Sequence, residues 1–425
     1  MIKVLASSWA LLLGMMLLQV GNGLQGTLLG VRGQLEGFST FSMSVVMSAY
    51  FVGFLFGSRM APEMIRRVGH VRVFAALGSL ISAVLILYPV ATHPIAWMAG
   101  RVLIGFCFSG VYVTAESWLN NAATNETRGQ SLSLYMIVQM VGIVSAQGIM
   151  VLADPSGFIL FIIPSVLVSI AFAPILLSIS PTPAYGTTKP MSLIQIMRIS
   201  PLGCVGMFLL GGVFSAQFGM APVFGAEAGL SVGQISAFVS TFFIGTLVLQ
   251  YPIGWLSDRM DRRILILGCA VIGGLGALVG FALSGYFVML LIAGLMIGGV
   301  SNPLYALLIA YTNDFLDFDD MAAASGGMVF INGLGAVTGP LLTGWIMGVI
   351  GPRGFFLFIA ALLLAMAGYA AYRMTQRAAP SVEDTESYAP VALGATPMAV
   401  EFAQEYAIET AQEEAALEEE ANTPS

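Results

Sequence analysis

The sequence consists mostly of long apolar segments separated by short polar turns, and this pattern limits the possible folds more than any other feature. A helix needs about 20 apolar residues to cross a hydrocarbon core about 30 Å thick. Backbone groups in lipid must pair within their own segment, and these segments lack the alternation of barrel strands. We therefore predict an all-α integral membrane protein with twelve transmembrane helices, approximately at 5–31, 41–61, 71–91, 95–119, 130–152, 157–179, 202–224, 233–256, 263–284, 286–310, 323–349 and 354–374.

The distribution of basic residues predicts how these helices are oriented. Cytoplasmic loops of membrane proteins carry an excess of Lys and Arg. If the N-terminus is cytoplasmic, thirteen of the sixteen Lys and Arg residues fall in cytoplasmic positions. Only Arg32 and Arg353 fall outside, and Arg101 lies within a span. We therefore expect a multi-pass protein of the inner, or plasma, membrane with both termini in the cytoplasm.

The two halves of the sequence repeat each other. An offset of 192 residues pairs Gly53 with Gly245, and an offset of 193 pairs Gly105 with Gly298. Six helices per half make the repeats parallel, related by an axis along the membrane normal. We predict a six-helix bundle at 1–180, a cytoplasmic linker at 181–200, a second six-helix bundle at 201–377 and an acidic cytoplasmic tail at 378–425.

The tail differs in composition from the rest of the chain. It contains eleven acidic residues and no Lys or Arg, and its first part is rich in Pro, Ser and Thr. Such a segment is expected to be largely disordered, although 400–421 has the pattern of a charged helix. Two roles are open for this segment, a solubilising tail and a helix that docks a partner.

A loop motif identifies a family resemblance. The segment that runs Gly254-Trp-Leu-Ser-Asp258-Arg259-Met-Asp261-Arg262-Arg263 resembles the G-x-L-x-D-R-x-G-R-R signature of the major facilitator superfamily. The corresponding segment of the first half is degenerate, with Arg66 at the position of the Asp. The resemblance implies the major facilitator fold and a latch made by carboxylate and arginine side chains on the cytoplasmic side.

The fourth predicted span strengthens the resemblance. The run Arg101-Val-Leu-Ile-Gly105 resembles the R-x-x-x-G element of the superfamily's fourth helix, and the segment that begins at Glu116-Ser117 resembles its YcaD-like branch. An ionised group in lipid costs at least about 3 kcal/mol, so Arg101 is a functional candidate. Anion binding, proton-linked gating and a structural pair with carbonyls remain open for it. A gate salt bridge to Arg66 or Arg67 and proton carriage remain open for Glu116.

Polar side chains inside the predicted spans mark a central cavity. They lie on helices that line the cavity in the resembled family, although buried amides also bond helices to one another. The predicted cavity residues are Gln19, Asn22, Gln25, Arg101, Tyr112, Gln139, Gln217, Asn302, Tyr305 and Asn332. The predicted cytoplasmic gate residues are Arg66, Arg67, Glu116, Asp258, Arg259 and Asp314, with Asp314 facing Arg259.

Several chemical functions lack a sequence signal. Lys3 and Lys189 follow Ile and Thr, so no G-K-[ST] phosphate loop is present. His70 and His93 stand alone, without a triad or a metal-ligand pattern. We therefore predict neither an enzyme nor a metal or other cofactor, and no nucleic-acid partner.

We therefore predict a secondary active or facilitated transporter that moves a small neutral or anionic solute by alternating access. Its partners are the solute and the lipid bilayer, with coupling to protons left open, and we expect a monomer. The alternative is a non-transporting receptor or scaffold of the same fold that acts through the acidic tail.

Overall fold

The computed structural model describes residues 2–124, 127–177, 191–377, 388, 391 and 395–406, and all regular structure within them is helical. The first half contains α1 (Ile2–Leu35), α2 (Thr40–Val68), α3 (His70–Leu87), α4 (Pro94–Ala122), α5 (Arg128–Met150), α6 (Ile159–Ala171) and α7 (Ala173–Leu177). The short helix α8 (Leu193–Ile199) precedes the second half. The second half contains α9 (Pro201–Ser215), the π-helical turn η2 (Ala216–Met220), α10 (Ala221–Glu227), α11 (Val232–Ser257), α12 (Arg262–Ala282), α13 (Phe287–Asn313), α14 (Phe318–Ile350) and α15 (Gly354–Met374).

Within the described ranges, eleven helical segments are long and apolar enough to cross a membrane, with α9, η2 and α10 forming one of them. The remaining predicted span, at 157–179, corresponds to α6 and α7, whose apolar part is shorter. The predicted helical membrane protein is therefore confirmed. The count of twelve is reached when α6 and α7 are taken together as one span.

Equivalent turns begin the second helix of each half. Gly37 and Gly229 have positive φ angles of 73° and 74°, a conformation that glycine adopts without the penalty of a Cβ. Two residues later, the Ser39 and Ser231 side chains accept hydrogen bonds from backbone amides in the first turns of α2 and α11. The same short sequence pattern thus ends one span and starts the next in both halves.

Glycines at equivalent positions bring pairs of helices into backbone contact. A Cβ on Gly105 of α4 would lie 1.9 Å from the carbonyl oxygen of Tyr50 on α2. A Cβ on Gly298 of α13 would lie 2.2 Å from the carbonyl oxygen of Phe242 on α11. Small residues permit such close helix approach in membranes. The predicted sequence repeat is therefore a repeat of helix crossings.

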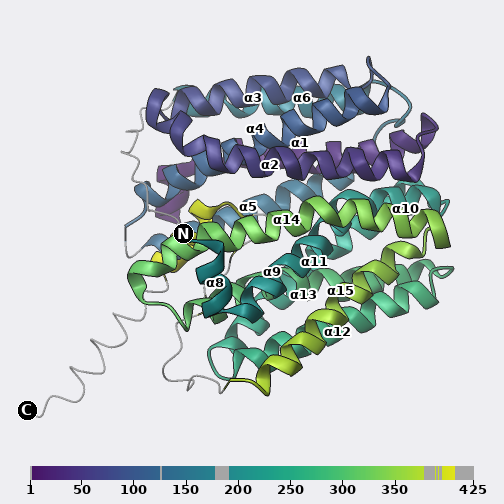
Figure 1. Ribbon diagram of the computed structural model, residues 1–425. Helices are drawn as coiled ribbons and strands as arrows, with labels where there is room; N and C mark the ends of the chain where they lie inside the picture. The colour runs from purple at the N-terminus through teal and green to yellow at the C-terminus, as the bar shows by residue number, and fades with distance from the viewer. Residues whose placement is uncertain are drawn as a thin grey trace, which may run out of the picture.

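The two halves pack side by side, and Figure 1 shows α1 to α6 above α9 to α15, with α2 against α14. We call the end that carries Arg66, Arg67, Arg128, Arg262 and Arg263 the basic end; it also carries α8. At the opposite end, the Thr40 hydroxyl of α2 donates a hydrogen bond to the Glu227 carboxylate of α10. Gly344 of α14 packs there against Ser44 of α2. The halves are thus joined at the opposite end.

Part of the acidic tail folds back against the bundle. Residues 397–406 are helical, and the side chains of Val400, Phe402 and Ala403 are buried. Figure 1 shows this helix in yellow at the basic end, between the two halves. Of the two roles left open for the tail, a solvated segment does not fit residues 395–406, because their buried apolar side chains are covered by the bundle. The other residues of 378–425, apart from Tyr388 and Val391, lie outside the described residues, as does the first half of the predicted linker, 181–190.

Candidate functional site

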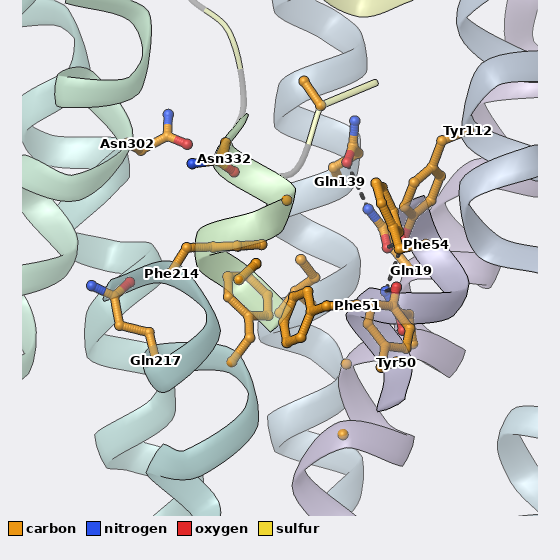
Figure 2. Close-up of a pocket in the computed structure, with 18 of the residues that line it drawn as sticks. Gln19, Tyr50, Phe51, Phe54, Tyr112, Gln139, Phe214, Gln217, Asn302 and Asn332 are labelled. Atoms are coloured by element: carbon orange, nitrogen blue, oxygen red, sulfur yellow. Dashed lines mark hydrogen bonds between the residues drawn. The ribbon is translucent and has the colours of Figure 1, made fainter. Parts of the chain in front are cut away.

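A cavity of about 110 Å³ lies between the two halves, and Figure 2 shows the residues around it. Nine of the ten residues predicted to line a cavity do line it: Gln19, Asn22, Gln25, Arg101, Tyr112, Gln139, Gln217, Asn302 and Asn332. The exception is Tyr305, which is fully buried on α13 and is not among the lining residues. The structure thus brings these nine side chains together from six helical elements, α1, α4, α5, η2, α13 and α14.

The wall formed by the first half is a connected polar network. The Asn22 amide donates a hydrogen bond to the Tyr112 hydroxyl at 2.8 Å, and this hydroxyl donates to Gln19 at 2.7 Å. Gln19 in turn donates to Gln139 of α5 at 2.6 Å. Such mutually satisfied groups fix one another's orientation. The wall therefore presents amide and phenol groups in defined positions.

Arg101 of α4 lies in the same wall and is 3% exposed. Its Nη1 donates to the Gln25 amide oxygen at 2.9 Å, and its Nη2 lies 3.6 Å from the Met47 sulfur. The guanidinium also lies over the Tyr50 ring, 4.6 Å from the centroid. Among the described residues, no carboxylate forms an ion pair with Arg101, and its Nε has no hydrogen-bond acceptor.

The amides of the second half are bonded mainly within that half. Gln217 donates to the Ser301 hydroxyl at 2.7 Å, and Asn332 donates to the Met207 carbonyl at 3.0 Å. Asn302 donates to Gln250 at 2.8 Å. These bonds tie neighbouring helices together, which is the alternative that the sequence left open for buried amides.

Gln217 owes its place in the wall to a π-helical turn. Pro222 has no amide hydrogen, so it cannot donate to the Phe218 carbonyl as an α-helix would require. Just before this proline, the amide of Ala221 bonds to the carbonyl of Ala216, five residues earlier, rather than to that of Gln217, four residues earlier. π-Turns inside α-helices are frequent at functional sites. Pro222 is the sequence signal that could have located this turn.

Aromatic side chains form a large part of the remaining lining, and they were not predicted from the sequence. The lining includes Tyr50, Phe51, Phe54, Phe214, Phe218, Phe242 and Phe243. Phe51 of α2 and Phe214 of α9 meet edge to face across the two halves, with centroids 5.9 Å apart (Figure 2). Phe214 also contacts Phe218 at 4.5 Å. Their spacing of four residues, on either side of Gln217, could have indicated a shared face.

The predicted salt bridge between Glu116 and Arg66 or Arg67 is wrong. Both arginines bind Glu63 on the same exposed turn of α2, at 2.8 and 2.6 Å. Glu116 is 2% exposed and accepts hydrogen bonds from the Tyr135 hydroxyl, at 3.0 Å, and from the Thr396 hydroxyl. A carboxylate three or four residues away on the same helix is the nearest partner for each arginine.

The predicted pair of Asp314 with Arg259 is also wrong. Asp314 forms its ion pair with Arg262, and both side chains are buried. Arg259 lies over the Trp255 ring, 4.3 Å from the centroid. Asp258 accepts a hydrogen bond from the backbone amide of Tyr388 at 2.8 Å. Burial raises the pKa of Asp258 above its usual range, and this hydrogen bond offsets part of the rise.

Comparison with known proteins identifies the class. The family model described as Major Facilitator Superfamily matches residues 11–232 and 203–397. The chain belongs to this superfamily and is a transmembrane transporter by family and fold. The match confirms the family that the loop motif and the R-x-x-x-G element indicated.

Curated relatives are transporters of the same superfamily. An uncharacterized MFS-type transporter named YcaD, from Escherichia fergusonii, is 24% identical over 360 residues, which are 83% of this chain and 92% of the relative. An uncharacterized MFS-type transporter of Yersinia enterocolitica is also 24% identical, with the same coverage. The resemblance to the YcaD-like branch is thus confirmed.

Two crystal structures show the same fold. That of the nucleoside transporter NupG has a TM-score of 0.69 and 14% identity, covering 89% of this chain and all of that one. The structure of a bacterial homolog of the human lysosomal transporter Spinster, in an inward-facing and unoccupied conformation, has a TM-score of 0.67 and 13% identity. The match covers 96% of this chain and 97% of that one.

Proposed function

We propose that this protein moves a small neutral or anionic solute across the inner membrane by alternating access, with the solute bound in the cavity between the two halves. The observation that carries the proposal is that one polar and aromatic cavity receives side chains from both six-helix halves. Rocking of one repeat against the other around a site near the midplane is the motion expected of such a fold.

The contacts between the halves support this motion. On the side of the opposite end, Thr40 bonds to Glu227 and Ser48 bonds to the Val337 carbonyl at 2.5 Å. These contacts involve side chains that can separate and re-form. Within a half, by contrast, Gly105 and Gly298 hold helices at backbone contact. Two rigid bodies with a separable interface are therefore the units of the proposed movement.

The proposed orientation places the basic end in the cytoplasm. Arg66, Arg67, Arg128, Arg262 and Arg263 lie at this end, whereas Arg32 and Arg353 lie at the other. With the opposite end closed by Thr40 and Glu227, solute would have to enter and leave the cavity at the cytoplasmic side. Both termini are proposed to be cytoplasmic, and the transporter is proposed to act as a monomer.

Coupling to protons is a separate part of the proposal. No described acidic side chain lines the cavity, and the carboxyl proposed to carry a proton is that of Glu116, which lies between the cavity and the basic end. Flux in proteoliposomes with an imposed proton gradient, compared with exchange flux without one, separates coupled from facilitated movement. A Glu116→Gln variant that retains exchange but loses gradient-driven accumulation would assign the coupling to this carboxyl.

Transport itself is tested with purified protein in proteoliposomes. A stabilisation screen of small metabolites identifies solutes that raise the melting temperature, and the uptake of each labelled solute is then measured. We expect saturable uptake that falls at least about tenfold in Asn22→Ala, because loss of a site's hydrogen-bond partner leaves other buried groups unpaired. Absence of saturable flux for every stabilising solute would favour the receptor or scaffold alternative.

A further inference from the structure

The buried guanidinium of Arg101 lacks a counter-charge among the described residues. Its partners are the Gln25 oxygen, the Met47 sulfur and the face of the Tyr50 ring, all of them uncharged. An isolated buried charge is costly unless an opposite charge or a full set of acceptors compensates it. Here Nε has no acceptor, and the side chain belongs to the cavity lining.

On the side of the second half, phenylalanines form a large part of the lining, and the amides of Gln217, Asn302 and Asn332 donate hydrogen bonds within that half. Phe214, Phe218 and Phe243 contact one another in sequence, with centroids 4.5 and 5.2 Å apart. The polar network of Asn22, Tyr112 and Gln19 belongs to the first half. A ligand that satisfies both sides must therefore have a polar end and an apolar body.

We propose that the solute is an amphipathic monoanion, whose carboxylate pairs with Arg101 and whose apolar or aromatic body packs against the phenylalanines. This inference rests on the proposed function and narrows its substrate class from neutral or anionic to anionic. A guanidinium matches a carboxylate in geometry, and a single cation balances a single negative charge. Phenyl rings bury a flat apolar body without requiring a specific hydrogen bond.

The test uses benzoate, phenylacetate and 4-phenylbutyrate as probes, each with its own amide as the uncharged counterpart. Binding to the purified full chain is measured by calorimetry for wild type, Arg101→Gln and Arg101→Lys. We expect at least one carboxylate to bind wild type about thirtyfold more tightly than Arg101→Gln, with a smaller loss in Arg101→Lys. The amides should not distinguish the three proteins.

Arg353→Gln is the matched control, because Arg353 is an exposed arginine in the turn before α15 and does not line the cavity. It should bind the carboxylates like wild type. Binding of no carboxylate in the set, equal binding to Arg101→Gln, or equal binding of acids and amides would each overturn the inference. Saturable uptake of an uncharged solute alongside any of these results would leave the proposed transport intact.

A second, independent observation concerns the tail. Ala395 lines the cavity, and the helix that follows it contacts both halves at the basic end. On the first half, Glu405 pairs with Arg128 and Thr396 bonds to Glu116. On the second half, Gln404 bonds to Asn313 at 3.1 Å and to the Ser325 hydroxyl.

Tyr388 and Val391 extend this contact on the side of the second half. The Tyr388 hydroxyl accepts a hydrogen bond from Gln250 at 2.7 Å, and its ring packs on Gly254. The Val391 carbonyl accepts a bond from Asn302, a cavity residue, at 3.4 Å. Tyr388, Val391 and residues 395–406 therefore lie at the basic end of the cavity, where a solute would have to pass.

We infer that the tail helix and the residue pair before it, that is 395–406 with Tyr388 and Val391, act as an autoinhibitory plug, which closes the cavity at the basic end and must leave before solute can exchange there. Bonds to both halves also oppose their relative movement while the tail is seated. A conformational coupling of this kind typically changes an equilibrium fivefold or more. Displacement of the tail should therefore raise flux.

The plug is tested in the full chain with Phe402→Glu, which places a charge where a ring is 1% exposed, and with Phe402→Leu as the apolar control. A chain ending at Arg377 is the third variant. Maleimide labelling of a Ser58→Cys reporter, a cavity-lining position near the basic end, measures access. We expect Phe402→Glu and the shortened chain to label and transport about fivefold faster than wild type and Phe402→Leu.

Equal labelling in all four proteins would overturn the plug. Faster labelling without faster flux, in a wild type that transports, would overturn its inhibitory role. If no variant transports any solute, the proposed function fails, whereas the labelling rates still decide whether the tail closes the cavity.

Discussion

The Thr396 hydroxyl donates a hydrogen bond to the Glu116 carboxylate, although 280 residues separate them in the sequence. The bond joins the acidic tail to the fourth helix at the basic end, close to the cavity. Glu116 therefore has a partner that comes from neither six-helix half. The site of a predicted gate is occupied by the chain's own C-terminal region.

The seated tail predicts a specific cross-link. Asn120 of α4 donates a hydrogen bond to the Glu405 carboxylate at 3.2 Å, so cysteines at these two positions should react with one short bifunctional maleimide. We expect an intramolecular link in Asn120→Cys/Glu405→Cys and none in either single variant. The native thiols at Cys107, Cys204 and Cys269 are buried and should not compete. Lack of the link in the double variant would contradict the seated position.

The proposed orientation predicts the side from which surface cysteines react. Arg66→Cys and Arg259→Cys should react with a membrane-impermeant maleimide only after the inner membrane is opened, because both lie at the basic end. Arg353→Cys should react in intact spheroplasts. Labelling of Arg66→Cys and Arg259→Cys from different sides of the membrane would contradict the prediction that the two halves are parallel repeats.

The glycine crossings predict matched losses of stability. Gly105→Ala and Gly298→Ala each insert a methyl group about 2 Å from a backbone carbonyl, so the helices must separate. Overpacking of this kind costs roughly 1–3 kcal/mol. Both variants should melt at lower temperature in detergent than wild type. The control is Gly268→Ala, where a Cβ meets no atom within 4 Å, and it should melt at or slightly above the wild-type temperature.

The loop between α11 and α12 predicts an acid-dependent loss of stability. Partial burial tends to raise the pKa of Asp261, but hydrogen bonds from the side chain and backbone of Arg263 outweigh it and lower the pKa below its usual range. A lowered carboxyl pKa stabilises the fold above the unfolded-state pKa, about 3.9, and the contribution is lost as the pH falls through the folded value. The stability difference between wild type and Asp261→Asn should therefore shrink as the pH falls below 4, as melting curves would show. A difference that does not change with pH would contradict the ion pair.

The sequence predicted the features that follow from composition and periodicity. Apolar segments of spanning length identified the helices, and the amides at Gln19, Asn22 and Gln25 identified a shared face of α1. Polar groups inside a membrane need partners or water, so their helical spacing indicates a common environment. The sequence could therefore predict that nine of the ten residues lie around one cavity. Their role in binding a solute stays a prediction.

The aromatic lining and the ion pairs required the structure. A phenylalanine in an apolar segment can face lipid, a neighbouring helix or a cavity at similar cost, so Phe214 carried no clear signal. The choice of Arg262 rather than Arg259 as the partner of Asp314 depends on the turn between α11 and α12. That turn points the Arg259 side chain back over Trp255 and leaves Arg262 facing α13.

The tail illustrates a different difficulty. Its composition resembles that of solvated segments, and only a few apolar residues, such as Val400 and Phe402, carry its packing. Those residues are covered because a recess between the two halves receives them, and a recess formed by distant helices leaves no mark on the local sequence. The contact could be found only after both halves were in place.

The unequal walls of the cavity have a mechanical consequence for the proposed movement. In the proposed complex, directional bonds to the solute would come mainly from the first half, through Asn22, Tyr112 and Arg101, whereas the second half would contribute mainly phenyl surfaces. A solute whose polar end is bound by the first half would move together with that half, while the phenyl rings of the second half slide along its apolar surface. Sliding over a phenyl ring breaks no hydrogen bond. The solute would therefore keep its hydrogen bonds to the first half throughout the change from one access state to the other.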